Sequence, residues 1–334
     1  MNIFVVGATG YVGLPLCEAL LAAGHQVRAL CRSEAKAAPL KALGITCISG
    51  DLSDVESLRR GMEGCQQAYH LAAFASAWHK NPQVFYDINV QGTLNVLEAA
   101  LSTGLEKVVL TSTAGVIGAS PSAQSSVHEA SNPNVQPTTL YEITKLKAER
   151  EAIAFANRSG LAVTIVNPSR IYGPGQLTES NAATKLIKRC YEGKWRILPG
   201  NGESMGNYVY IDDVVQGHLQ AMQYGQSGHR YILGGENVSF KEFFGLIREL
   251  SPHNKRLYKL PVPIMMGFAH SQLLMAEWFG RHPLIIPAFV RKYNYHWNLS
   301  SQKAIQELGY QITPLRQGVM QTIEWFNQNQ YERV

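Results

Sequence analysis

Two side chains that could move a proton together lie four residues apart near the middle of the chain. Tyr141 and Lys145 stand in the run Tyr-Glu-Ile-Thr-Lys, and helical geometry would place them on one face. A phenol ordinarily titrates near ~10, and a nearby ammonium favours its ionised form, which lowers that pKa. The pair could therefore exchange a proton near neutral pH. Because such pairs also arise by chance in helices without chemistry, the surrounding pattern matters.

A group of hydroxyls precedes this pair. Thr111-Ser112-Thr113 ends an apolar run at 107–110, which predicts a strand. Hydroxyls at the carboxyl end of such a strand point to the edge where open α/β sheets bind ligands, and one of them could hold a substrate oxygen. They could equally be turn residues, since Ser and Thr often cap loops. The pattern does not say which hydroxyl faces a ligand.

The N-terminus carries a pattern typical of dinucleotide binding. Residues 2–6 predict a strand, and Gly7-Ala8-Thr9-Gly10-Tyr11-Val12-Gly13 leads from it into a helical pattern at 15–23. The glycines would let the backbone approach a pyrophosphate, and the helix N-terminus would offer free N–H groups. A glycine turn alone is weak evidence. Together with Tyr141 and Lys145, it predicts a nicotinamide-dependent enzyme.

Strand and helix patterns alternate through the first half of the chain. The expected strands cover 2–6, 26–30, 46–49, 68–72, 107–111 and 162–167, and the expected helices cover 15–23, 34–43, 55–62, 83–102 and 141–158. Short β-rich runs separated by helices predict βαβ units with right-handed crossovers. We therefore expect an α/β fold, with a Rossmann-type doubly wound parallel sheet covered by helices on both faces.

The pattern changes at Pro168, after which prolines become frequent. Expected helices near 181–192, 213–224 and 240–250 alternate with short strands at 208–211 and 230–233. This predicts a dinucleotide-binding domain at 1–167. Residues 168–334 would form a mainly substrate-binding, smaller C-terminal α/β lobe, with some segments returning to the sheet. The apolar stretch 260–279 is expected to be a helix over the binding site, with shallow membrane contact as the alternative.

The composition limits the classes of function. The chain has 334 residues, of which 46% are hydrophobic, and a net charge of +5. It has no dense Lys/Arg block with interleaved aromatic residues that would indicate nucleic-acid binding, and no run of ~18 uninterrupted apolar residues that would span a membrane. The first apolar run is too short for a secretory signal, and five cysteines without a C-x-x-C pair favour reduced thiols. We expect a cytoplasmic protein with a small-molecule substrate, no nucleic-acid partner and no integral membrane segment.

Seven motifs in order along the chain resemble one family. They are Gly7–Gly13, Gly50-Asp51-Leu52, His70–Ala73, Asn89–Thr93, Thr111–Thr113, Tyr141 with Lys145, and Asn167–Pro174. Over nearly its whole length the chain resembles an extended short-chain dehydrogenase/reductase of the NAD-dependent epimerase/dehydratase superfamily. It is more similar to the dihydroflavonol-reductase-like and 3β-hydroxysteroid-dehydrogenase-like branches than to the sugar-nucleotide enzymes. Those branches mostly act on hydrophobic ketones or alcohols.

The resemblance implies roles for residues at matching positions. Thr113 would orient the substrate oxygen, Tyr141 would be the acid/base, and Lys145 would hold the nicotinamide ribose and lower the tyrosine pKa. Asp51 would bind the adenine amino group, and Asn89 would support the geometry of the site. The implied cofactor contacts are Gly7, Thr9, Gly10, Tyr11, Val12, Gly13, Arg32, Asp51, Leu52, Leu71, Ala72, Ala73, Asn89, Thr111, Tyr141, Lys145, Pro168 and Ile171. The expected substrate contacts are Trp78, Thr113, Tyr141, Ser169, Arg170 and Tyr172.

The end of the second expected strand bears on the choice of cofactor. A carboxylate there would accept hydrogen bonds from both ribose hydroxyls and select NAD. Cys31 stands at this position, followed by Arg32, and a guanidinium binds phosphate with two hydrogen bonds. We therefore expect NADP to be preferred, with NAD as the alternative. Arg32 could also be solvated, or stack on adenine with either cofactor.

One principal function follows, with two alternatives. The chain is expected to be an NAD(P)-dependent reductase or dehydrogenase that transfers hydride between NADP(H) and a hydrophobic ketone, aldehyde or secondary alcohol. The first alternative is a sugar or nucleotide-sugar epimerase/dehydratase that retains its cofactor. It is weakened by Met205-Gly206-Asn207, where those enzymes carry an Arg-Asp pair, and by Arg170, where they carry asparagine. The second is a redox sensor or scaffold without turnover, although such relatives usually lack the Tyr/Lys pair. Relatives pair the helices that match 83–102 and 141–158 across a two-fold axis, so we expect a homodimer.

Overall fold

A parallel sheet of seven strands organises the computed structural model, which describes residues 1–131, 137–177 and 181–330. In spatial order the strands are β10 (Arg230–Leu233), β6 (Ala162–Pro168), β5 (Lys107–Thr111), β4 (Gln67–His70), β1 (Asn2–Val6), β2 (Gln26–Cys31) and β3 (Thr46–Ser49). All neighbouring strands are parallel. The chain crosses from β3 back to β4 on the other side of β1, so the order reverses between β1 and β4. In such sheets this switch point is where ligands bind, and the predicted doubly wound sheet is confirmed.

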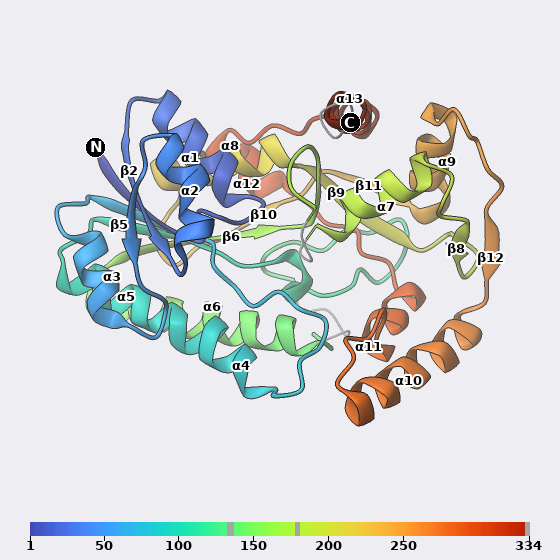
Figure 1. Cartoon of the computed structure of the whole chain (residues 1–334), viewed down its shortest axis with the longest axis horizontal. Helices are drawn as coiled ribbons and strands as arrows, with labels where there is room; N and C mark the ends of the chain where they lie inside the picture. Colours follow the sequence, from blue (N-terminus) through green and yellow to red (C-terminus); the bar gives the residue numbers. More distant parts are fainter. Residues whose placement is uncertain (132–136, 178–180, 331–334) are drawn as a thin grey trace.

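Helices cover both faces of this sheet (Figure 1). One face carries α1 (Gly13–Ala22), α2 (Glu34–Ala42), α8 (Ile211–Tyr224) and α12 (Gln302–Leu308), and the other carries α3 (Val55–Met62), α5 (Gly92–Ser102) and α6 (Leu140–Ser159). Successive residues of β1 point to opposite faces, so Val5 packs in the cluster with Leu16 while Phe4 packs in the cluster with Leu58. Burial on both faces explains why the strands are continuous apolar runs.

Two predicted elements of the first half differ from the structure. The strand expected at 68–72 ends at His70, because the N–H groups of Leu71 and Ala72 both turn to the carbonyl of Val6, at 2.8 and 3.0 Å. The helix expected at 83–102 consists of α4 (Gln83–Tyr86), a π-helical turn (Asp87–Gln91) and then α5. The hydrogen-bond pattern of that turn widens locally, which hydrophobic periodicity does not report.

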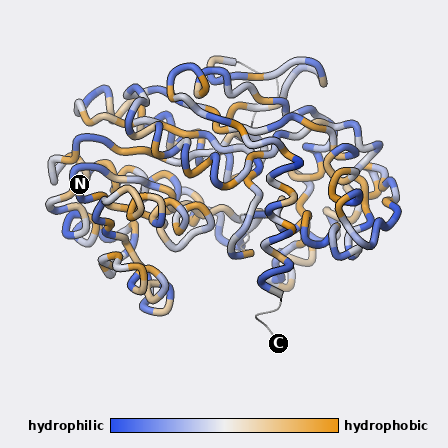
Figure 2. Tube along the Cα trace, turned by 90° about the horizontal axis from the view of Figure 1, so that it is seen from above, coloured by the Kyte–Doolittle hydropathy of each residue, from blue (hydrophilic) through white to orange (hydrophobic). Residues whose placement is uncertain are grey.

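The second half builds a smaller lobe beside the sheet. β7 (Arg170–Tyr172), β9 (Met205–Tyr210) and β11 (Glu236–Ser239) form one sheet, and β8 (Ile197–Pro199) pairs with β12 (Tyr258–Leu260). Against them pack α7 (Ala182–Tyr191), α9 (Phe240–Leu250) and α13 (Leu315–Gln330). α13 is seen end-on in Figure 1 and lengthwise in Figure 2, where hydrophilic and hydrophobic positions alternate along it toward the C-terminus. β10, α8 and α12 return to the large sheet, and the division into domains at residue 167 stays a prediction.

α10 (Val262–Phe279) confirms that the apolar stretch 260–279 is helical, and several of its large apolar side chains are exposed to solvent. The helix packs on α11 (Pro287–Arg291) at one end of the molecule (Figure 1). On its outer side, Trp278 and Phe279 are 76% and 68% exposed. The loop that follows reaches the loop after β4, where the His282 ring meets the Trp78 ring edge-on at 6.2 Å. Within residues 1–131, 137–177 and 181–330, no helix has the length and apolar character needed to cross a membrane.

A buried histidine ties α8 to the sheet. His218 Nδ1 lies 2.7 Å from the Val214 carbonyl oxygen, and Nε2 lies 2.8 Å from Thr111 Oγ1. Because a carbonyl can only accept, Nδ1 carries the proton and Nε2 accepts from the Thr111 hydroxyl. Burial lowers the pKa of His218 to about 4.

This histidine should make the fold sensitive to acid. Below ~6.5 the unfolded chain binds a proton that the folded chain does not bind until about 4, so stability is lost as the pH falls through this window. We expect His218→Gln to reduce the loss in free energy of unfolding between pH 7 and pH 4.5 by about 2 kcal/mol. Urea unfolding at the two pH values measures this difference. Exposed His253, changed to glutamine, is the control, and an unaltered acid loss in His218→Gln would contradict the prediction.

Candidate active site

The glycine loop after β1 brings three pieces of backbone close together. Gly7 has a φ of 98°, and a Cβ at this position would lie 2.6 Å from the backbone nitrogen of Ala72. A Cβ at Gly13 would lie 2.1 Å from the carbonyl oxygen of Gly7. The N–H of Gly10 donates to that same oxygen at 3.0 Å and closes the turn ahead of α1. Side chains here would push the loop, α1 and the β4 loop apart, so the glycines keep the helix N-terminus accessible to a pyrophosphate.

Tyr11, inside this loop, points into the smaller lobe. Its hydroxyl donates to the Gly173 carbonyl at 2.9 Å and lies 3.2 Å from Thr184 Oγ1, and its ring is buried. The side chain therefore joins the glycine loop to the lobe, which leaves only the backbone of Tyr11 for the expected cofactor contact. Thr9 and Val12 beside it are half-buried.

Asn89 connects the loop after β4 to α6. It lies in the π-helical turn Asp87–Gln91, where its side chain accepts from the N–H of Phe74 at 2.7 Å and donates to Thr144 Oγ1 at 3.0 Å. Phe74 follows the β4 loop, and Thr144 lies on α6. The amide thus fixes the loop that carries Leu71–Ala73 against the helix that carries the tyrosine and lysine. π-Helical turns are frequent at functional sites.

Tyr141 stands in the first turn of α6, at the carboxyl edge of the sheet. The helix begins where the Thr139 hydroxyl accepts from the N–H of Glu142 at 3.2 Å. Burial, and to a smaller extent the Glu142 carboxylate, raises the pKa of Tyr141 above its ordinary value. The lowering predicted from Lys145 is not seen in this geometry. A phenol of this kind stays protonated at neutral pH and can act as a proton donor.

The three hydroxyls after β5 have different surroundings. Thr111 is bonded to α8 on one face of the sheet, and Ser112 lies beside the Glu149 carboxylate on the other. Thr113 is half-buried, and its Oγ1 accepts from the N–H of Gly115 at 3.2 Å. Among the described residues, the Thr113 hydroxyl donates a hydrogen bond to no acceptor. Ser112 Oγ also has no hydrogen-bond partner of normal geometry among the described residues, but it is buried, so the half-buried Thr113 is the more accessible of these two hydroxyls for a substrate oxygen.

Lys145 is 1% exposed, and its Nζ has no hydrogen-bond partner among the described residues. Burial lowers its pKa to about 8, and the nearby Glu149 carboxylate opposes that shift. Burying an ammonium without hydrogen bonds is costly. This orphaned donor therefore fits a ligand that brings hydroxyl oxygens, as a ribose does.

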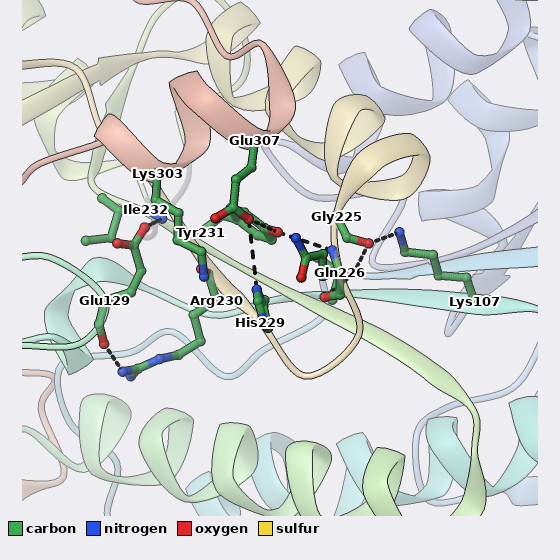
Figure 3. Close-up of polar contacts among 11 residues, drawn as sticks. Lys107, Glu129, Gly225, Gln226, His229, Arg230, Tyr231, Ile232, Lys303 and Glu307 are labelled. Atoms are coloured by element: carbon green, nitrogen blue, oxygen red, sulfur yellow. Dashed lines mark hydrogen bonds and ion pairs between the residues drawn. The ribbon is translucent and has the colours of Figure 1, made fainter.

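A buried carboxylate network that the sequence analysis missed lies around Lys145. Glu149 accepts from Asn167 Nδ2 at 2.6 Å and lies 3.4 Å from Arg230 Nη1. Burial raises the pKa of Glu149, while its hydrogen bonds and Arg230 oppose the rise. Arg230, the first residue of β10, also donates to the carbonyl of Glu129 (Figure 3). The network joins α6, β6 and β10, and only the position of Glu149 four residues after Lys145 could have suggested it.

The end of β2 carries no free carboxylate. Arg32 is exposed, and the next acidic residue, Glu34, is paired with Lys41. Asp51 follows β3 and accepts from both the N–H and the hydroxyl of Ser53, at 2.7 and 2.6 Å. These bonds lower the pKa of Asp51, and Arg32 adds a smaller effect. The two residues predicted to hold the adenosine end therefore lie near each other.

The remaining predicted contacts fall in three settings. Pro168 is buried at the end of β6, whereas Leu52, in the loop after β3, and Ile171, in the middle of β7, are half-buried. Ser169 Oγ is buried without a hydrogen-bond partner among the described residues. Tyr172 is 0% exposed, with its hydroxyl donating to the Leu315 carbonyl at 3.4 Å. It is a core residue, so its predicted contact with substrate is not supported.

The site and the fold define a class of protein. A strand, a glycine loop and a helix form a pyrophosphate cradle. On a helix at the same sheet edge stand a tyrosine and a buried lysine whose Nζ has no hydrogen-bond partner among the described residues. These are the parts of a nicotinamide-dependent enzyme of the short-chain dehydrogenase/reductase type.

Comparison with known proteins gives the family. The model of the NAD dependent epimerase/dehydratase family matches residues 3–234, and the chain belongs to this family. Sterol demethylase protein B of Methylococcus capsulatus is 33% identical over 336 residues, which cover 98% of this chain and 99% of that protein. A Synechocystis sp. protein provisionally named dihydroflavonol 4-reductase is 33% identical over 337 residues, covering 98% and 95%. The solved structure of gox2253 has a TM-score of 0.82 at 30% identity and covers 98% of each chain.

These findings confirm the predicted family. Relatives include dihydroflavonol-reductase-like and 3β-hydroxysteroid-dehydrogenase-like proteins, as the motifs indicate. The chain is an NAD(P)-dependent enzyme of the reductase, dehydrogenase or epimerase type.

Proposed function

We propose that this enzyme is an NADP(H)-dependent reductase or dehydrogenase of a hydrophobic ketone, aldehyde or secondary alcohol. The observation that carries the proposal is the buried Nζ of Lys145, which has no hydrogen-bond partner in the described part of the chain. It lies one helical turn from Tyr141, at the sheet edge reached by the glycine loop. The nicotinamide, when bound, supplies hydride to the substrate carbon or takes it up. A relative provisionally named as a dihydroflavonol reductase supports the same class of reaction.

Each catalytic side chain has one task. In reduction Tyr141 donates its proton to the substrate oxygen, and in oxidation it takes the proton back. The Thr113 hydroxyl donates a hydrogen bond to that oxygen and fixes its position. The Lys145 ammonium would bind the ribose hydroxyls of the cofactor and so hold the nicotinamide beside Tyr141.

An assay of cofactor consumption tests the reaction class. A reductase lowers the near-ultraviolet absorbance of NADPH when it is offered a panel of hydrophobic ketones and aldehydes. A cofactor-retaining epimerase leaves that absorbance unchanged, because hydride returns to the same molecule. If no compound of the panel causes NADPH to be consumed, and the enzyme interconverts a pair of sugar epimers, the epimerase function would replace our proposal.

The preference for NADP rests on Arg32, which is exposed at the end of β2 where no free carboxylate stands. We expect Arg32→Ala to weaken NADPH binding about 10-fold, because a guanidinium–phosphate contact is lost, and to change NADH binding much less. Fluorescence titration with each cofactor measures both affinities. Lys36→Ala, another exposed cation nearby, is the matched control. Equal losses for NADPH and NADH would reject the preference.

A further inference from the structure

Arg170 holds a positive charge that no described residue neutralises. Its guanidinium lies 5.5 Å from the ring centre of Tyr208 and 5.3 Å from that of Phe240. Nη1 is buried without a hydrogen-bond partner, and within the described residues Arg170 forms no ion pair. The Tyr208 hydroxyl, which lies beside the guanidinium, likewise makes no hydrogen bond of normal geometry to any residue that the structure describes. Arg170 is half-buried, and a charge partly withdrawn from water is ordinarily paired, so this guanidinium is suited to bind an anion.

The position of the guanidinium depends on a glycine. A Cβ at Gly206 would lie 1.8 Å from Arg170 Nη1, so the guanidinium rests directly on the backbone of β9. Any other residue at this position would displace it. The chain thus holds Arg170 in place by shape, without an acidic residue.

The surrounding charges add a second cation. Lys292 pairs with the buried Glu142 carboxylate, and Arg170 is close enough to lower the pKa of Lys292. Among the described residues, this cluster of Arg170, Lys292 and Glu142 therefore carries two positive charges and one negative. One further negative charge would balance it.

The cluster borders the catalytic residues. Glu142 follows Tyr141 in the first turn of α6, and a Cβ at Gly115, two residues after Thr113, would lie 2.4 Å from Glu142 Oε1. Arg170 is therefore linked, through Lys292 and Glu142, to the first turn of the helix that carries Tyr141.

We propose that Arg170 binds a carboxylate of the substrate, so that the enzyme acts on hydrophobic hydroxy or oxo acids whose carboxylate lies near the reacting carbon. This rests on the proposed function and specifies its substrate class. One planar guanidinium, close to the rings of Tyr208 and Phe240, matches the two oxygens of a carboxylate. A phosphate has more oxygens and would need further N–H donors to bind them. The nearby N-terminus of α9, beside Phe240, does not supply the N–H groups of Ser239 and Glu242, because its own Ser239–Glu242 capping box already uses them.

The test compares an acid with its neutral ester. With NADP⁺, wild-type enzyme should oxidise 3-hydroxydecanoate with a kcat/KM about 10- to 100-fold above that for its methyl ester, the range expected for a charge-assisted hydrogen bond. Arg170→Gln should bring this acid-to-ester ratio close to one. Gly206→Ala should lower the ratio as well, since it displaces the guanidinium and keeps its charge. Gly245→Ala, where a Cβ meets nothing within 4 Å, should leave the ratio unchanged.

Binding measurements separate this proposal from the proposed function. Calorimetric titration of decanoate into the NADP⁺ complex should show binding that weakens about 10-fold or more in Arg170→Gln. If decanoate binds in this way and no hydroxy acid or ketone turns over, the carboxylate site stands and the reductase proposal fails. A wild-type enzyme that treats acid and ester alike, or variants that keep the wild-type ratio, would overturn the carboxylate site. Tighter binding of decyl phosphate than of decanoate would overturn the choice of carboxylate.

Discussion

Turnover of a carbonyl substrate should fall about 10²- to 10⁴-fold when Tyr141 is replaced by phenylalanine, because a positioned acid–base group contributes that much to the rate. The change removes one oxygen atom and keeps the ring. Burial raises the pKa of Tyr141, so the phenol holds its proton at neutral pH and is the group able to deliver it. NADPH affinity should change little, since the glycine loop and Lys145 remain. NADPH consumption gives kcat, and fluorescence titration gives the dissociation constant.

A matched tyrosine provides the control for this change. Tyr224, at the end of α8, is 55% exposed, and its replacement by phenylalanine should preserve both turnover and NADPH binding. Wild-type turnover in Tyr141→Phe would refute the assigned acid. Parallel loss of turnover and NADPH affinity would make Tyr141 a binding or structural residue instead.

The large sheet could be predicted almost completely from the sequence. β1 and β3 have the predicted bounds, 2–6 and 46–49. Parallel strands buried on both faces are short apolar runs between turns, and that signal is local. The smaller lobe was predicted less well, because β7, β8 and β12 are three residues long and give too few positions for a pattern. β7 even begins with a charged residue, Arg170.

In the candidate site, too, the features with a local sequence signal were predicted and the long-range contacts were not. The motifs place the glycine loop, Thr113, Tyr141 and Lys145 at one sheet edge, as predicted from the order of strands. The Glu149–Arg230 contact joins residues 81 positions apart, and no local spacing reveals it. Tyr172 shows the opposite error, because a motif contains core residues as well as ligand contacts, and a buried tyrosine in sequence is indistinguishable from one that lines a site.

Replacing Lys145 by methionine should stabilise the fold while it removes activity. Burial lowers the pKa of Lys145 from 10.5 to about 8, which corresponds to about 3 kcal/mol of folding free energy lost while the ammonium is charged. Methionine is similar in length and carries no charge, although Glu149 loses a cationic neighbour. We expect the free energy of unfolding at pH 7 to rise by about 1–3 kcal/mol. Urea unfolding measures this rise, and the NADPH-induced increase in melting temperature should shrink in the same variant.

The pH dependence of stability identifies the cause. Between about 8 and 10.5 the unfolded chain keeps the lysine proton that the folded chain has released, so wild-type stability gains from this group as the pH rises through that window. The methionine variant should lack this gain. Lys147→Met, an exposed position on the same helix, should retain it. A less stable Lys145→Met variant with an unchanged pH slope would mean that Nζ is not an unpaired cation in the folded protein, and the inferred bond to ribose hydroxyls would lose its physical basis.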